Sequence, residues 1–171
     1  MTPELSHPLA LGDIGEDEVV VEITADANQR RRLAARFDLV AVAALEAVLR
    51  VHRAPAGRLL VRGRITAEVV QRCVVSLEPV AARIEAEVAR TYAGGRAAAA
   101  GPEVVVEALA GEIVEALPAG ALDLGEVVAE ELGLAIDPYP RKPGASLAEA
   151  PAPAASPPSP FAVLARLRRQ G

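Results

Sequence analysis

Large aromatic side chains are scarce in this sequence, which has no Trp, two Phe and two Tyr among its 171 residues. Protein modules that recognise single-stranded RNA usually stack its bases on Phe, Tyr or Trp. The chain lacks the side chains for such a platform, so this class of RNA-binding protein is disfavoured. The hydrophobic content of 51% is mostly Ala, Val and Leu, and we therefore expect a core of small aliphatic side chains.

Cysteine and lysine occur once each, as Cys73 and Lys142. A single cysteine cannot form an intramolecular disulfide or supply the thiolates of a Cys-rich zinc site. The formal net charge of −5 is opposite in sign to that of proteins that bind nucleic acid mainly by neutralising phosphates. Any contact with RNA must therefore use a local basic surface, or a partner protein must provide the contact.

Targeting and membrane signals are not visible in the sequence. Residues 1–15 have neither a basic start nor a long apolar segment, so no secretory signal is predicted. No run of about 18 apolar residues occurs, as a membrane-spanning helix would require. We therefore expect a cytoplasmic protein without a membrane partner.

Alternation of apolar and polar residues predicts an antiparallel sheet of at least three strands with one buried and one solvent-exposed face. The alternating segments are residues 45–52, 59–69 and 82–88. Pro55 and Gly57 favour a hairpin turn between the first two segments. Val19–Thr24 is rich in β-branched residues and predicts a further strand. Residues 104–117 fit either a strand or a helix.

Capping residues predict two helices. Asp26 can accept hydrogen bonds from the first free N–H groups of one helix. Asp123 begins the second helix, with Glu126 three residues later as in a capping box. Pro138 and Pro140 end this second helix because proline lacks the N–H that the next turn needs.

The expected fold is α+β, an antiparallel sheet flanked by helices, followed by a Pro/Ala-rich C-terminal linker and a short tail helix. The expected parts are an irregular N-terminal lead-in (1–15), a single α+β domain (16–145), a Pro/Ala/Ser linker (146–160) and a short C-terminal helix (161–171). The tail helix would present Phe161, Leu164 and Leu167 on one face.

No residue pattern predicts a catalytic or cofactor site. His7 and His52 have no Cys, Ser or Asp partner in a recognisable motif, and the glycines do not form a phosphate-binding loop. Cys73 follows a strand pattern and is expected to be a small buried residue, while its use as a nucleophile is a less favoured alternative. The sequence thus predicts a protein that is not an enzyme and needs no metal, cofactor or small-molecule substrate.

A stripe of arginines is the strongest charge pattern. It consists of Arg58, Arg62, Arg64 and, at the same parity, Arg72. Because alternate strand residues share a face, these side chains are expected to project together. Glu46 and Glu68 are the only acids expected nearby. The stripe is either an ordinary solvated face or a surface whose positive field attracts RNA phosphates.

Two segments resemble the signature of the large-ribosomal-RNA-subunit accumulation protein family (YceD-like) in its alphaproteobacterial form. They are residues 70–80 (VQRCVVSLEPV) and residues 122–145, and the tail PFAVL at 160–164 adds a weaker match. The motif residues are Gln71, Cys73, Leu77, Glu78, Pro79, Asp123, Glu130, Pro138 and Pro140. The resemblance covers about residues 16–171. It implies a non-enzymatic bacterial factor for accumulation of large-subunit (23S) ribosomal RNA and for large-subunit assembly.

The resemblance does not carry over a metal site. Many relatives have cysteine pairs that suggest one, but Val70 stands here where the first cysteine would be. Arg141 and Gly144 lie in the region of the later pair. One thiolate cannot make a four-ligand zinc site, so packing around Leu77 and Pro79 is expected to hold the motif instead.

The segment after the second helix is a candidate binding patch. It offers Asp137, Tyr139, Arg141 and Lys142. The cations can contact a phosphate or a carboxylate, and the aromatic ring can pack on a base or on a partner side chain. Alternatively, Tyr139 covers the core. The expected partner is ribosomal RNA or a large-subunit ribosomal protein, and a second hypothesis is a general protein–protein adaptor unrelated to ribosomes.

Overall fold

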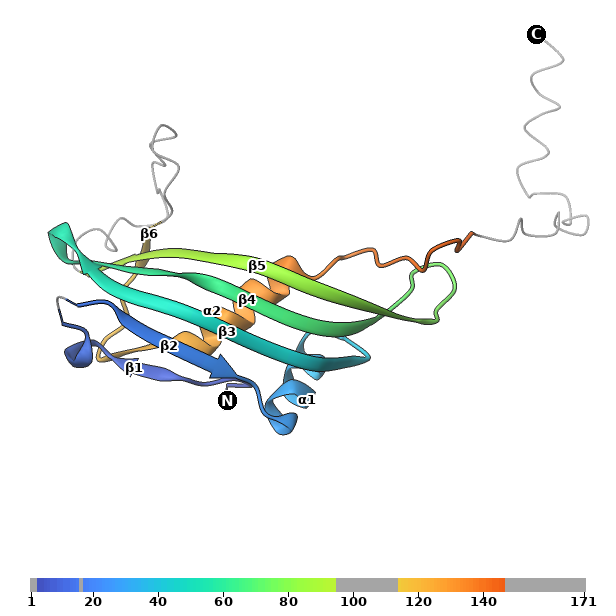
Figure 1. Ribbon diagram of the computed structural model, residues 1–171, viewed down its shortest axis with the longest axis horizontal. Helices are drawn as coiled ribbons and strands as arrows, with labels where there is room; N and C mark the ends of the chain where they lie inside the picture. Colours follow the sequence, from blue (N-terminus) through green and yellow to red (C-terminus); the bar gives the residue numbers. More distant parts are fainter. Residues whose placement is uncertain (1–2, 16, 95–113, 147–171) are drawn as a thin grey trace, which may run out of the picture.

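The computed structural model describes residues 3–15, 17–94 and 114–146. Its main features are a five-stranded sheet and two helices (Figure 1). In spatial order its strands are β2 (Val19–Thr24), β3 (Ala41–Ala54), β4 (Arg58–Arg72), β5 (Pro79–Ala93) and β6 (Val114–Ala116). Neighbouring strands are antiparallel except for β5 and β6, which are parallel. The predicted α+β fold with an antiparallel sheet is therefore confirmed.

The predicted hairpin joins the long strands β3 and β4. A short 3-10 turn at Pro55–Gly57 connects them, and Ala56 and Gly57 adopt φ values of 61° and 70°. Burial alternates along both strands, as expected for strands with one face against a core.

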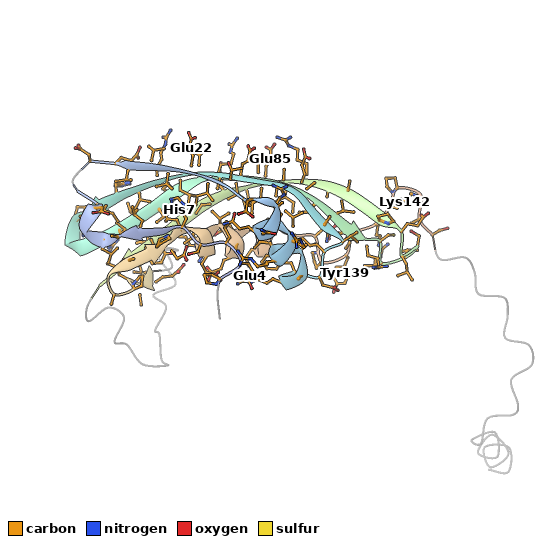
Figure 2. The ribbon with its side chains drawn as sticks, turned by 90° about the horizontal axis from the view of Figure 1, so that it is seen from below. Glu4, His7, Glu22, Glu85, Tyr139 and Lys142 are labelled. Atoms are coloured by element: carbon orange, nitrogen blue, oxygen red, sulfur yellow. The ribbon has the colours of Figure 1, made fainter. Side chains whose placement is uncertain are left out.

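One face of the sheet carries both helices. Helix α2 (Leu124–Ala135) runs diagonally across this face, and α1 (Ala27–Arg36) lies at one end of it (Figure 1). Figure 2 shows the helices beneath the sheet and Glu22 and Glu85 on the opposite face. The largest buried side chains between these layers include Leu33, Leu45, Leu49, Val61, Ile65, Leu124 and Leu132. The opposite face, which we call the outer face, has no described element packed on it.

Asp26 caps α1 as predicted. Its Oδ1 accepts hydrogen bonds from the N–H groups of Asn28 at 2.7 Å and Gln29 at 2.8 Å. The Gln29 side chain accepts in return from the N–H of Asp26 at 2.8 Å. This complete capping box satisfies N–H groups that the helix itself cannot pair.

Asp123 caps α2, but Glu126 does not complete a capping box. The Asp123 carboxylate accepts from the N–H of Gly125 at 2.9 Å. The carboxylate of Glu126 instead accepts two hydrogen bonds from Arg36, at 2.7 Å and 3.0 Å. The stronger, charge-assisted partner on α1 therefore replaces the expected contact and links the two helices.

The N-terminal segment differs from the predicted irregular lead-in. Strand β1 (Pro8–Ala10) pairs with β7 (Ala121–Asp123), a 3-10 turn follows at Leu11–Asp13, and Leu5 and Ile14 are buried. Three residues are too few to show an alternating pattern, and the partner strand is distant in sequence. The sequence alone therefore gave no sign of this pairing.

Several predicted segments lie outside the described residues. They are the loop expected at 94–101 after its first residue, the linker at 146–160 after its first residue, and the tail helix at 161–171. Within the ambiguous segment 104–117, residues 114–117 are described, and Val114–Ala116 of these form β6.

Candidate functional site

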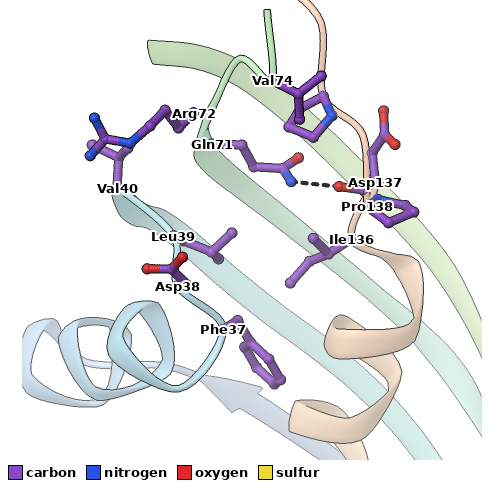
Figure 3. Close-up of a pocket in the computed structure, with 11 residues that line it drawn as sticks. Phe37, Asp38, Leu39, Val40, Gln71, Arg72, Val74, Ile136, Asp137 and Pro138 are labelled. Atoms are coloured by element: carbon purple, nitrogen blue, oxygen red, sulfur yellow. Dashed lines mark hydrogen bonds between the residues drawn. The ribbon is translucent and has the colours of Figure 1, made fainter. Parts of the chain in front are cut away.

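The two sequence motifs meet at one end of the molecule, where β4 ends beside the segment that follows α2 (Figure 3). The side-chain Nε2 of Gln71, which is buried, donates to the carbonyl oxygen of Asp137 at 2.7 Å. The N–H of Val74 donates to the carbonyl oxygen of Pro140 at 2.9 Å. We call residues 71–79 and 137–142 together the motif end.

Cys73 is a hydrogen-bond acceptor at the centre of the motif end. Its Sγ lies 3.3 Å from the N of Ser76 and 3.4 Å from the N atoms of Val75 and Lys142. Hydrogen bonds to the sulfur, first that of the Lys142 N–H, favour the thiolate and lower the pKa of Cys73 to about 6. The side chain is fully buried, as predicted, and it joins both motif segments.

Backbone hydrogen bonds shape the turn after Cys73. The N–H of Leu77 donates to the Cys73 carbonyl at 3.0 Å, and the Cys73 N–H donates to the Glu78 carbonyl at 2.8 Å. Leu77 is 65% exposed, and Pro79 is also exposed. The expectation that packing around Leu77 and Pro79 holds the motif is therefore wrong, because polar contacts around Cys73 and Gln71 hold it.

Lys142 forms an ion pair within the motif end. Its Nζ lies 2.9 Å from a carboxylate oxygen of Glu78. This ammonium group lowers the pKa of the Glu78 carboxyl. The neighbouring Arg141 is exposed. Of the two cations predicted to bind a partner, Lys142 already forms an ion pair with a carboxylate of this chain, whereas Arg141 is exposed to solvent.

Tyr139 points away from the core. It is 71% exposed, and its backbone N–H donates to Oδ1 of Asp137 at 2.8 Å. The alternative in which Tyr139 covers the core is therefore wrong. Its ring stands on a turn that Asp137 and the flanking prolines restrain, which keeps the predicted binding role open.

A groove of about 310 Å³ lies beside the motif end (Figure 3). Its lining comes from the α1–β3 connection, the end of β4 and the segment after α2: Phe37, Asp38, Leu39, Val40, Gln71, Arg72, Val74, Ile136, Asp137, Pro138 and Pro140. Most of these side chains are apolar. Asp38, Asp137 and Arg72 supply the charges, so Arg72 belongs to this groove.

The arginine stripe lies on the outer face as predicted, but it is not uniformly positive. Its members on this face are Arg58, Arg62 and Arg64. Glu87 of β5 lies opposite Arg64, with 3.9 Å between their charged groups. Arg50 on β3 similarly lies 3.8 Å from Glu18. The expectation that only Glu46 and Glu68 lie nearby is therefore wrong, because Glu87 on β5 and Glu18 directly before β2 also lie close to arginines of this face.

The motif residues Asp123 and Glu130 lie away from the motif end and have structural partners. The Asp123 carboxylate accepts from the Ser6 hydroxyl and the His7 N–H, both at 2.7 Å. Glu130 lies 3.2 Å from Arg90. The hydrogen bonds of Asp123 hold the N-terminal segment at the start of α2, and the ion pair of Glu130 links α2 to β5.

Arg90 was not singled out from the sequence. Its side chain is 15% exposed and contacts Glu115 at 2.7 Å, Glu131 at 2.9 Å and Glu130 at 3.2 Å. The predicted strand at 82–88 would have placed Arg90 on the buried face if extended by one repeat. The groove residues Asp38 and Val40 gave no comparable signal, because they lie in a connection between elements.

The described residues contain no cluster of side chains that could hold a metal ion. Within 3–15, 17–94 and 114–146, no three His, Cys, Asp or Glu side chains are grouped to hold a metal ion. In the same ranges, no helix has the length and apolarity to span a membrane. The groove beside the motif end combines apolar side chains with exposed polar groups, among them the side chains of Asp38, Arg72 and Asp137.

Comparison with known proteins identifies the family. The family model of the large ribosomal RNA subunit accumulation protein YceD matches residues 61–168, more than half of the chain. This match includes both segments of the motif end and α2. No curated protein and no solved structure matches the chain. The chain therefore belongs to the large ribosomal RNA subunit accumulation protein YceD family.

Proposed function

We propose that this protein is a non-enzymatic factor that supports accumulation of large-subunit ribosomal RNA and assembly of the large ribosomal subunit. The observation that carries the proposal is the family match over residues 61–168. The contacts of Gln71, Cys73 and Lys142 support it, since they join the two matched motifs into one surface. We expect the protein to act in the cytoplasm, without a membrane or small-molecule partner.

The direct ligand is ribosomal RNA or a large-subunit ribosomal protein. Two groups of residues are alternative candidates for this contact: Arg58, Arg62, Arg64 and Arg72 on β4, and Asp137, Tyr139, Arg141 and Lys142 after α2. The first group offers guanidinium groups for phosphates or carboxylates. The second group offers an exposed aromatic ring on a restrained turn.

Depletion in the native bacterium tests the proposal. We expect the ratio of large-subunit to small-subunit ribosomal RNA to fall and to recover when the wild-type chain is supplied. The tagged protein should also co-sediment with large-subunit precursor particles. An unchanged RNA ratio together with no co-sedimentation would refute the assembly role and favour a general adaptor.

Complementation with Cys73→Ser tests whether Cys73 acts as a nucleophile. Serine keeps an acceptor at this position but lacks the reactive thiolate. If the variant restores the RNA ratio fully, a catalytic role of Cys73 is excluded. A folded variant that binds precursor particles but restores nothing would contradict the non-enzymatic proposal.

A further inference from the structure

Exposed apolar side chains gather at the motif end and the adjacent groove. They are Val40, Val74, Leu77 and Tyr139. Val40 and Val74 line the groove, and Leu77 and Tyr139 belong to the motif end. Concentrated apolar surface of this kind marks an interaction site more often than scattered single residues do.

Leu77 adds an independent sign of function. It adopts φ 61°, a left-handed conformation that is unfavourable for any residue with a branched apolar side chain. The turn from Cys73 to Glu78 nevertheless holds it there and leaves it largely exposed. Backbone strain that presents an apolar side chain to solvent is the pattern expected of a contact residue.

Hydrogen bonds join the three walls of the groove to one another. Its wall at the end of β4 is hydrogen-bonded to its wall after α2 through Gln71 and Asp137 and through Val74 and Pro140. The α1–β3 wall is fixed to β4, since the N–H of Val40 donates to the Val70 carbonyl at 2.8 Å. A preorganised groove loses little conformational entropy when it is filled.

Charge distinguishes between the possible partners. Asp38 and Asp137 line the groove, and Arg72 is the one cation in its lining. The whole chain also carries a net charge of −5. RNA phosphates entering the groove would approach two carboxylates, whereas Lys or Arg side chains of a protein would be attracted to them.

We propose that the groove beside the motif end docks a positively charged segment of a large-subunit protein. An apolar side chain of this segment fills the groove, and its cations contact Asp38 and Asp137. The inference rests on the assembly role proposed above and identifies the direct ligand of that role as a protein, with the ribosomal RNA affected through it.

Site-specific photocrosslinking of the purified full chain tests the inference. The photoreactive p-benzoylphenylalanine replaces Val40 in the groove, and in a matched control it replaces Val48 on the outer face; these residues are 51% and 45% exposed. The probes are proteins extracted from large subunits by salt and deproteinised large-subunit ribosomal RNA. We expect the Val40 position to crosslink to a basic large-subunit protein and the Val48 position to give only background adducts.

Removal of the groove carboxylates should change crosslinking at Val40 in opposite directions for the two possible ligands. The adduct with a basic protein should weaken, whereas an adduct with RNA should strengthen. Asp38→Asn with Asp137→Asn retains a residue that tolerates positive φ at position 38. It also retains an acceptor for the Tyr139 N–H. We expect the protein adduct at Val40 to fall roughly tenfold. The double variant Glu22→Gln with Glu85→Gln removes the same charge from the outer face and should leave the adduct unchanged (Figure 2).

Four outcomes would overturn the inference. The adduct at Val40 could be no stronger than that at the Val48 control, or the main adducts could be to RNA and increase after carboxylate removal. The adducts could also be only to this chain or a second copy of it, or the protein adduct could be unaffected by the Asp38 and Asp137 substitutions. If the adducts are to RNA and depletion lowers the ratio of large-subunit to small-subunit ribosomal RNA as expected, the inference is refuted and the assembly role stands. A charge-sensitive adduct to the basic protein without any effect of depletion would refute the assembly role alone.

Discussion

At the scale of single residues, the sulfur of Cys73 links the two segments of the motif end. It accepts hydrogen bonds from both segments of the motif end. Gln71 bridges the same segments from within the core. Two polar side chains thus perform the holding role that sequence reasoning assigned to the apolar residues Leu77 and Pro79. The difference arises because hydrogen-bond partners of a buried polar group cannot be read from one sequence.

The pKa of Cys73 predicts how stability depends on pH. Its value in the folded state is lowered to about 6, so folding favours the thiolate. The resulting stabilisation is present above the ordinary thiol pKa and is lost as the pH falls through about 6. Under reducing conditions, we expect the difference in free energy of unfolding between the wild type and Cys73→Ser to grow from about pH 6 to about pH 9. Urea unfolding across this range measures it, and a pH-independent difference would show that Cys73 does not ionise preferentially in the fold.

At the scale of elements, α2 packs unusually closely on the N-terminal segment. A Cβ added to Gly125 would lie 2.7 Å from the carbonyl oxygen of Leu5 and 2.8 Å from the N of His7. Both neighbours are backbone atoms, which cannot move away as a flexible side chain can. The absence of a side chain at Gly125 is therefore what allows β1, β7 and the start of α2 to meet.

Gly125→Ala is expected to destabilise the protein, although alanine normally favours a helix over glycine by about 1 kcal/mol. Overpacking against backbone typically costs about 1–3 kcal/mol, and we expect a net loss in this range by urea unfolding. Gly12→Ala is the matched control, since its added Cβ meets no atom within 4 Å. A Gly125→Ala variant as stable as the wild type would mean that the N-terminal segment does not dock on α2 in solution.

The sequence predicted the elements whose own pattern is long enough. Alternation over many residues specified β3, β4 and β5, and caps with terminating prolines specified α2. The strands β1 and β7 have three residues each and pair across more than a hundred positions, so no local pattern reveals them. The motif residues of the candidate site were predicted from the resemblance, whereas Asp38 and Val40 join the site only through the path of the chain between α1 and β3.

At the scale of the whole molecule, Arg90 connects three elements. From β5 it contacts Glu115 on β6 and Glu130 and Glu131 on α2. These interactions hold a short parallel edge strand and the covering helix to the sheet. Removal of the guanidinium would leave three carboxylates close together without a cation, and breaking a buried ion pair on one side is costly.

Arg90→Met is expected to lower the free energy of unfolding at neutral pH by about 2–3 kcal/mol, below the full cost of a buried pair because two of the carboxylates are partly solvated. Arg83→Met removes an exposed pair with Glu85 at 3.0 Å and should change stability by less than about 0.5 kcal/mol. Equal losses in the two variants would contradict a structural role specific to Arg90.

Ligand contact at the outer face and docking in the groove lead to different expected effects of substitutions in cells. Arg50→Gln with Arg64→Gln removes two cations whose carboxylate partners lie 3.8 Å and 3.9 Å away in exposed positions, so stability should change by less than about 1 kcal/mol. If a protein docked in the groove is the direct ligand, this double variant should restore the ribosomal RNA ratio in depleted cells, while Val74→Asp in the groove should not. Both variants must accumulate to the wild-type level, measured by immunoblot. Failure of Arg50→Gln with Arg64→Gln alone would instead assign the ribosomal contact to the arginines of the outer face, because neutralising phosphates depends on the number of cations and little on the groove.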